Sequence, residues 1–254
     1  SRFSDGFAPA ITRYSGAYAQ AIVEPAEQVT LTAGARIDDH KSYGSKATFS
    51  ANAVWRPMAS TIIRAAYGEG FKAPTLYQLF SFFGDPNLQP EVAKSYEFGF
   101  EQSLLNGQLR FGATAFQRRT NNMIDFDLFF FRYNNIIRSR AKGVESFIEL
   151  RPSDRLSLRA SYTYVDSEKR EFGAAAYVPH LRRPAHSLNA SIDWNAFDKV
   201  KLGADLRIAS DSLDGFGGSV RMDGYALLGV RASVPLGEAF ELYGRVENVG
   251  DADY

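Results

Sequence analysis

The feature that most constrains this chain is an alternation of apolar and polar side chains with a period of two residues. In residues 29–38, 156–164, 200–208 and 226–234, apolar side chains occupy every second position, and most of the positions between them hold polar residues or glycine. Successive side chains of a β-strand point to opposite faces, so each of these segments forms a strand with one apolar and one polar face. The sequence therefore predicts an all-β fold.

Counting such segments gives roughly a dozen strands of about ten residues, the length that a tilted strand needs to cross a bilayer. Few soluble domains contain so many strands of such even length, although a soluble β-sandwich or β-solenoid also alternates in this way. The predicted strands span residues 14–24, 28–38, 46–56, 60–69, 92–105, 108–120, 140–151, 155–167, 184–194, 200–210, 222–235 and 239–249.

The connections between these strands alternate between short and long. Tight turns are predicted at residues 25–27, 57–59, 106–107, 152–154, 195–199 and 237–238. Longer links are predicted at residues 39–45, 70–91, 121–139, 167–183 and 209–221. In an antiparallel up-and-down barrel, alternate connections lie at the same end, and outer-membrane barrels have short periplasmic turns and long extracellular loops. The pattern predicts a transmembrane antiparallel up-and-down β-barrel.

Composition excludes several other classes. Basic and acidic residues number 29 each, so the net charge is zero and nothing indicates a nucleic-acid partner. The chain has no cysteine, which excludes disulfides and thiolate metal sites. The sequence contains no apolar run of 18 residues or more, which excludes a membrane-spanning helix. A barrel strand gives a much weaker signal and is not excluded.

The aromatic and charged residues predict which face meets lipid. Tyrosines gather at strand ends near the long links (Tyr67, Tyr162, Tyr164), and other aromatics lie near the tight turns (Trp55, Trp194, Phe240). Two aromatic belts at the two membrane interfaces would produce this distribution. An arginine facing lipid at mid-bilayer costs about 2–4 kcal/mol, so Arg64 is expected to face inward, with Ile63, Ala65 and Tyr67 outward.

The longest link, residues 70–91, is expected to be ordered. Pro74, Pro86 and Pro90 each fix φ and remove a backbone donor. The residues before Pro86 and Pro90 are biased toward extended geometry. The segment is therefore expected to be a turn-rich loop and not a helix.

Four stretches carry a family resemblance. They are residues 71–76 (FKAPTL), 84–91 (GDPNLQPE) with 95–97 (SYE), 141–145 (AKGVE) and 245–254 (RVENVGDADY). Together they resemble the corresponding motifs of TonB-dependent outer-membrane receptors, and the resemblance runs from about residue 14 to the end. It implies a barrel of about 22 strands filled by an N-terminal plug that carries the TonB box. Residues 1–254 are expected to be a partial barrel, about its C-terminal half, lacking the plug and the last strand.

The resemblance also implies a function: an outer-membrane receptor of a Gram-negative bacterium that binds a scarce, bulky ligand at its extracellular loops and imports it with energy from TonB. Within the family, the chain is most similar to cobalamin receptors in residues 122–126, 133–145, 162–166 and 181–183. Cobalamin is therefore the favoured ligand and a ferric siderophore the alternative. The expected partners are outer-membrane lipid, TonB and this small-molecule ligand. A passive porin of about a dozen strands is a further alternative.

Candidate ligand contacts lie in the long links, where aromatic, amide and cationic side chains could grip a large ligand. The run of residues 126–133 (FDLFFFRY) either extends a strand above the membrane or forms an apolar loop surface for the ligand. The candidate residues are Tyr77, Phe82, Phe130, Tyr133, Asn134, Arg138, Arg182 and Arg183.

Little indicates catalysis. His186 and Ser187 would suit an outer-membrane hydrolase, but adjacent strand residues point to opposite faces and cannot act as base and nucleophile together. The groups Asp38-Asp39-His40 and Asp251-Asp253 could hold a cation through oxygen ligands, or could be loop carboxylates satisfied by water and turn amides. The sequence predicts a protein that is not an enzyme, with no metal site and no cofactor.

Overall fold

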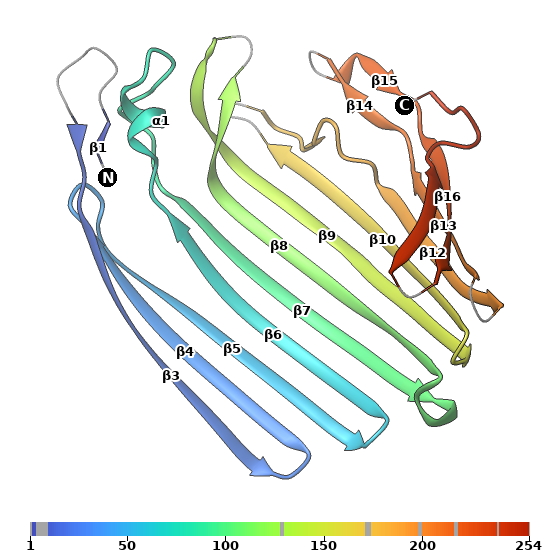
Figure 1. Cartoon of the computed structure of the whole chain (residues 1–254). Coiled ribbons are helices and arrows are strands. Elements are labelled where there is room, and N and C mark those ends of the chain that lie inside the picture. The colour runs from blue at the N-terminus through green and yellow to red at the C-terminus, as the bar shows by residue number, and fades with distance from the viewer. Residues whose placement is uncertain are drawn as a thin grey trace.

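The computed structural model describes residues 2–3, 10–127, 130–170, 174–197, 200–215, 218–237 and 239–253. Most of the chain forms one curved, single-layer antiparallel sheet (Figure 1). Its main strands are β3 (Tyr14–Ala26), β4 (Val29–His40), β5 (Gly44–Met58), β6 (Thr61–Lys72), β7 (Glu91–Leu104), β8 (Leu109–Asp127), β9 (Arg132–Ser153), β10 (Leu156–Arg170), β12 (His186–Phe197), β13 (Val200–Ala209), β16 (Tyr225–Leu236) and β17 (Phe240–Val246).

These twelve strands are hydrogen-bonded in the order in which they occur along the chain, which confirms the predicted up-and-down architecture. The smaller elements are β1 (Arg2–Phe3) with β2 (Ala10–Ile11), β14 (Ser212–Asp214) with β15 (Val220–Met222), β11 (Val178–Pro179) on β10, the helix α1 (Leu76–Phe80) and the 3₁₀ turn η1 (Leu105–Gly107). Among the described residues, no helix is long and apolar enough to span a membrane.

The register separates the side chains of the sheet onto two faces. Residues that pair directly across strands share a face, and one such row runs through Leu31, Ala53, Ala65, Phe98 and Ala115. The face that carries Leu31, Leu158 and Val230 is called the outer face below, and the face that carries Arg36, Arg159 and Arg231 the inner face.

The outer face is apolar and open to the surroundings. Its large side chains are exposed in the isolated chain, including Phe49, Phe98, Ile148 and Leu242. The aromatic residues expected in two belts, Trp55 and Trp194 among them, all lie on this face. A continuous exposed apolar face of this extent is what a hydrocarbon environment requires.

The inner face carries paired charges, and small residues make room for them. Arg64 lies on this face as predicted, 4.0 Å from Glu101, while Arg110 donates to Glu101 at 2.7 Å. A Cβ at Gly99 would lie only 2.6 Å from Arg64 Nε, so the glycine lets the guanidinium lie flat across β7. In β16, Arg231 crosses Gly203 in the same way and donates to Asp205 and to a second carboxylate, Asp193.

Gly143, in the middle of the AKGVE motif, is also required by close packing, here between two strand backbones. A Cβ at this position would overlap the carbonyl oxygen of Tyr164 and would lie 2.9 Å from the ring of Phe116. The backbone of β9 therefore approaches β10 more closely than a side chain would permit.

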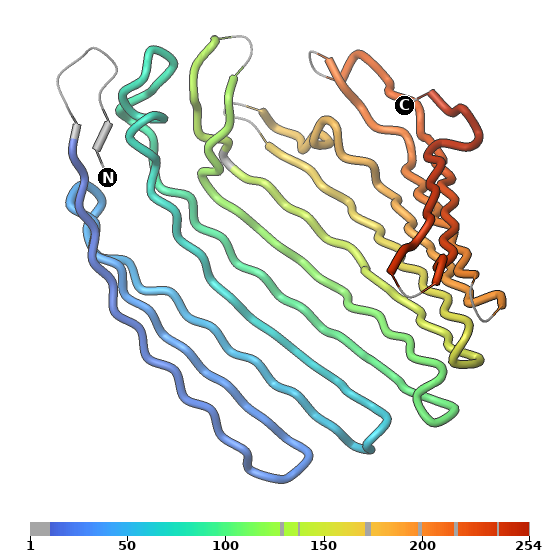
Figure 2. The backbone as a smooth tube through the Cα atoms, viewed as in Figure 1, coloured from blue at the N-terminus to red at the C-terminus, as the bar shows by residue number. Residues whose placement is uncertain are grey.

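Successive connections lie at opposite rims, as expected, but the predicted alternation of short and long fails at two of the predicted long links, which are short. The turns expected to be tight lie at one rim of the sheet, and the opposite rim, called the loop rim below, carries α1 and the other long connections (Figures 1 and 2). The expected link 39–45 is a three-residue turn in which Tyr43 N–H donates to the carbonyl of His40 at 3.1 Å. Glu238 and residues 198–199, in predicted tight turns, lie outside the described residues.

The expected link 121–139 is mostly strand, because β8 continues to Asp127 and β9 begins at Arg132. Asn122 interrupts the pairing with a φ of 53°, a conformation that asparagine tolerates better than most residues. The link 209–221 contains the hairpin β14–β15, so the strand predicted from residue 222 begins at Tyr225.

Candidate ligand-binding rim

The helix α1 shows that the expectation of a helix-free loop at residues 70–91 was wrong. Thr75 caps the helix: its side chain accepts the N–H of Gln78 at 3.1 Å, and Gln78 Oε1 accepts the N–H of Thr75 at 3.0 Å. This reciprocal capping box satisfies two donors at the helix start. Leu76 and Leu79 are buried, and Leu79 packs with Leu88 and Ile124. Packing of this kind can hold a single turn that would not be stable alone.

The rest of the loop folds back on the helix. Asp85 N–H donates to the carbonyl of Gln78 at 2.9 Å, and Asp85 Oδ1 accepts the N–H of Asn87 at 2.8 Å, as in an Asx turn. A Cβ at Gly84 would lie 2.7 Å from the backbone of Leu79, so this close return requires glycine. The loop is ordered, as predicted from its prolines.

Asn135 of β9 fastens this loop to the β8–β9 hairpin. Its Oδ1 accepts the backbone N–H of Gln89 at 2.7 Å, and its Nδ2 donates to the carbonyls of Gln89 (3.0 Å) and Asn122 (2.7 Å). Beside it, Leu88 is only 2% exposed, and its carbonyl accepts the hydroxyl of Tyr43 at 3.1 Å. Sequence reasoning did not find Asn135, because its partners are far away along the chain.

An aromatic cluster covers this junction. Edge-to-face contacts join Tyr77 to Tyr133 (6.1 Å between ring centroids), Tyr133 to Phe126 (5.4 Å), Phe126 to Phe83 (5.7 Å) and Phe83 to Phe82 (5.1 Å). Phe82 is 84% exposed, whereas Tyr133 packs on the buried leucines. The structure therefore brings together three of the predicted ligand contacts, Tyr77, Phe82 and Tyr133.

Phe130 and Asn134 lie on the same hairpin. Phe130 is exposed, its N–H bonds to Asp127 Oδ1 at 3.0 Å, and the guanidinium of Arg132 lies 5.7 Å from its ring. Asn134 Oδ1 accepts the N–H of Asn135 at 3.0 Å. The run 126–133 thus contains the ends of β8 and β9, with exposed aromatic residues near the tip of the hairpin; its residues 128–129 lie outside the described part.

Arg182 and Arg183 belong to a separate part of the rim. Arg182 adopts a φ of 57°, its N–H bonds to the carbonyl of Leu213 at 2.7 Å, and its side chain donates to Asp214 at 2.8 Å. The guanidinium lowers the pKa of the Asp214 carboxyl through this hydrogen bond. Arg183 donates to Ser167 Oγ at 3.3 Å. Arg182 therefore joins the loop after β11 to the hairpin β14–β15.

A buried histidine, His180, anchors the loop that carries Arg182 and Arg183. His180 is 7% exposed; its Nε2 lies 2.8 Å from Ser139 Oγ, and its backbone N–H donates to the carbonyl of Ser167 at 2.9 Å. Burial, together with the nearby charges of Arg183 and Lys169, lowers the pKa of His180 to about 4. The ring is therefore neutral at pH 7.

Arg138 lies apart from the other candidates. Its pairing with Asn121 places it on the outer face of β9, where it lines a cavity of about 540 Å³ with Lys94 and Arg119. Among the described residues, no side-chain hydrogen bond, ion pair or ring contact links Arg138 to the aromatic cluster or to Arg182.

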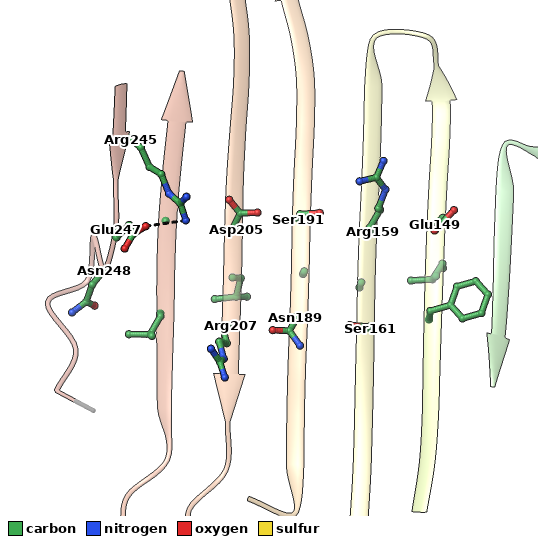
Figure 3. A pocket seen from close by; sticks show the side chains of 17 residues that line it. Glu149, Arg159, Ser161, Asn189, Ser191, Asp205, Arg207, Arg245, Glu247 and Asn248 are labelled. Atoms are coloured by element: carbon green, nitrogen blue, oxygen red, sulfur yellow. Dashed lines mark ion pairs between the residues drawn. The ribbon is translucent and has the colours of Figure 1, made fainter. Parts of the chain in front are cut away.

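A larger cavity lies on the inner face, where the sheet curves between β9 and β17. Its volume is about 800 Å³, and Arg159, Asp205 and Arg207 project into it (Figure 3). At its β17 edge, Arg245 and Glu247, two residues apart in the chain, form an ion pair at 2.9 Å. The alternation in the sequence indicated that such residues face inward, but gave no sign that they line one hollow.

The described residues do not form a hydrolytic centre from His186 and Ser187. His186 pairs with Tyr164 on the outer face and its Nδ1 lies 2.7 Å from Tyr162 Oη, whereas Ser187 pairs with Thr163 on the inner face. The two side chains point to opposite sides of β12, as the sequence predicted.

Two of the candidate cation ligands, Asp38 and Asp39, are satisfied by other groups. Asp38 pairs with Arg36 at 2.6 Å, and Asp39 Oδ1 accepts the hydroxyl of Ser45 at 2.7 Å. Within the part of the chain that the structure describes, no three His, Asp or Glu side chains converge in a way that could hold a metal ion.

Comparison with known proteins gives one family and several solved structures. The model of the family described as TonB dependent receptor-like, beta-barrel matches residues 2–249. The ferric enterobactin receptor of Pseudomonas aeruginosa, in complex with enterobactin, is 20% identical with a TM-score of 0.80, covering 96% of this chain and 41% of that one. The ferric-catecholate import receptor Fiu of E. coli is 16% identical with a TM-score of 0.78 over 96% of this chain and 41% of Fiu.

The siderophore receptor PirA of Acinetobacter baumannii is similar to the same degree. It is 16% identical with a TM-score of 0.80, and the match covers 94% of this chain and 42% of PirA. The chain thus spans about two fifths of the length of these receptors, and the likeness at this identity establishes the shared fold.

Proposed function

Because the chain belongs to the family of TonB-dependent receptor-like β-barrels, we propose that it forms part of an outer-membrane receptor that binds a ferric siderophore at its loop rim and imports it with energy supplied through TonB. Proteins of this family lie in the outer membrane of Gram-negative bacteria, and so does this chain. They are receptors and not enzymes, which agrees with the absence of a catalytic motif in the sequence.

The observation that carries the siderophore proposal is the match over 94–96% of the chain to three receptors named for siderophores or ferric catecholates. These names support the siderophore alternative better than cobalamin, the ligand favoured from the sequence. In the proposal, the 254 residues supply one part of the barrel wall, and the plug and the rest of the wall lie outside them.

The chemistry of the rim supports the same ligand class. A ferric catecholate combines aromatic rings with negative charge, so it would be bound by aromatic faces next to cations. The rim offers the exposed rings of Phe82 and Phe130, and Arg132 lies beside Phe130. Arg182 and Arg183 add two further cations on the neighbouring loop.

The proposal is tested by titrating the full-length receptor in detergent with ferric enterobactin, a ferric hydroxamate and cobalamin, each followed by calorimetry. We expect a dissociation constant below about 1 µM for a ferric siderophore, which corresponds to a binding free energy of about −8 kcal/mol. Binding of cobalamin alone would refute the proposal.

Two further measurements sharpen the test. Replacing Phe130→Ala and Arg183→Gln should weaken siderophore binding at least tenfold, whereas the inner-face variant Arg118→Gln should not change it. Uptake by cells should stop when TonB is deleted while binding persists. Ligand flux that continues without TonB would instead indicate a passive pore.

A further inference from the structure

Five cationic side chains gather on the outer face at the loop-rim end of three neighbouring strands. They are Lys94 of β7, Arg119 of β8, and Arg138, Arg140 and Lys142 of β9. All five line the cavity of about 540 Å³ described above. This is the face that elsewhere carries apolar side chains, so the cluster needs an explanation.

The register forces three of these cations side by side. Lys94 pairs directly with Arg119, and Arg119 pairs directly with Arg140, so one row across three strands holds three positive charges. Like charges directly opposite each other on a sheet are destabilising. Among the described residues, carboxylates neutralise the two ends of the row and not its centre: Glu69 lies 3.0 Å from Lys94, and Glu168 lies 2.5 Å from Arg140.

The central cation of the row and its neighbour toward the rim are left unneutralised. Arg119 and Arg138 are both exposed, and neither forms an ion pair with any residue that the structure describes. Lys142, one row toward the membrane, pairs with Asp166 at 3.2 Å. The cluster therefore presents a net positive charge to whatever lies outside the barrel wall.

The position of the cationic cluster along the strands indicates which part of the bilayer it faces. Tyr96 follows Lys94 by two residues on the same face and packs on Tyr67 at 5.1 Å, and Phe98 follows by two more. At about 3.4 Å per residue, the cations lie about 7 Å beyond the tyrosines, toward the loop rim. Because tyrosines mark the membrane interface, this is the level of the lipid headgroups.

We propose that this cluster binds the phosphate of a lipid headgroup in the outer leaflet, with Arg119 and Arg138 as the principal contacts. Guanidinium groups match phosphate oxygens in a bidentate geometry, and a phosphate at this position would relieve the repulsion within the row. Tyr177 also lines the cavity, with its ring 4.0 Å from the Arg140 guanidinium. The proposal requires only the outer-membrane location and is independent of the imported ligand.

The test uses the full-length receptor in nanodiscs of phosphatidylcholine containing 10 mol% of bisphosphorylated lipid A. Lipid retained after extraction is counted by native mass spectrometry. The double variant Arg119→Gln/Arg138→Gln should lower retention at least tenfold. The matched double variant Arg118→Gln/Arg207→Gln removes the same charge from the inner face and should retain lipid like the wild type. Thermal unfolding confirms that each variant is folded.

Two additional arms separate the sources of phosphate. Raising the salt concentration from 0.05 to 0.5 M should weaken retention by the wild type and have little effect on the Arg119→Gln/Arg138→Gln variant, since salt screens exposed charges. Dephosphorylated lipid A should not be retained. Equal retention by the two double variants, or occupancy by inorganic phosphate with no lipid retained, would overturn the proposal.

Discussion

Replacing Asn135 with alanine should release the loop of residues 73–90 from the β8–β9 hairpin. The side chain makes three hydrogen bonds, at 2.7 Å and 3.0 Å to the backbone of Gln89 and at 2.7 Å to the carbonyl of Asn122. Each is worth about 0.5–1.5 kcal/mol net. Because Gln89 is exposed and water can replace part of the loss, we expect a cost of about 2 kcal/mol.

A cost of about 2 kcal/mol raises the population of the open loop about thirtyfold, since each 1.4 kcal/mol corresponds to a factor of ten. Hydrogen exchange of the full-length receptor measures this directly. The amides of Leu79 and Asp85, which donate to backbone carbonyls within the loop, should exchange about thirtyfold faster in Asn135→Ala. Strand amides of β7 should exchange as before.

Asn134→Ala is the matched control, because the Asn134 side chain bonds only the N–H of Asn135, on its own strand, among the hydrogen bonds described above. It should change exchange in the loop less than threefold. If Asn135→Ala left the protection of residues 76–88 unchanged, the burial of Leu88 would hold the loop alone and the assigned role of Asn135 would be wrong.

Three further predictions concern other parts of the chain. Gly143→Ala should destabilise the folded receptor by about 1–3 kcal/mol because its Cβ would overlap β10, whereas Gly244→Ala, which meets no atom within 4 Å, should not; thermal unfolding in detergent compares them. Thr75→Ala should cost about 1 kcal/mol of local stability by removing the cap of α1, seen as faster amide exchange confined to residues 76–81. The pKa of His180 is lowered to about 4, so between about pH 6.5 and pH 4 the unfolded form binds a proton that the folded form does not. As the pH falls from 6.5 to 4, local stability around His180 should therefore fall by up to about 1.4 kcal/mol per pH unit. His180→Gln should abolish this slope, measured by amide exchange of residues 174–183.

The sequence predicted the sheet well because its strands meet two different environments. A strand with lipid on one side and water on the other must alternate apolar and polar side chains, so nearly every strand shows a period of two residues. The same reasoning placed Arg64 inward, and the structure confirms it with Glu101 nearby. Local pattern is sufficient where each residue's environment depends only on which face it occupies.

The loops were harder to predict because distant contacts determine their structure. Thr75 and Gln78 do form a recognisable capping pair, but three prolines in the segment argued against a helix, and the helix is held by packing on Ile124, far along the chain. Residues 121–122 and 134–135 are all asparagine, which favours turns, yet they lie within β8 and β9, where pairing between the two strands overrides that preference.

The candidate site was predicted only in part for the same reason. Aromatic residues in the long links indicated a binding surface, and Tyr77, Phe82 and Tyr133 do lie in one cluster. Arg138 was chosen for its charge and its place in a predicted loop. Because that loop is a strand, its side chain has a definite face, and that face is the outer one.

The central claim, that one face of this sheet meets hydrocarbon and the other meets water, can be measured by site-directed spin labelling. The 254 residues contain no cysteine, so single substitutions Leu31→Cys, Val230→Cys, Arg36→Cys and Arg159→Cys can be labelled in a full-length receptor without other cysteines. In lipid bilayers, labels at Leu31 and Val230 should collide with oxygen and be shielded from a water-soluble nickel complex. Labels at Arg36 and Arg159 should show the reverse, and equal or inverted accessibilities at the two pairs would contradict the account.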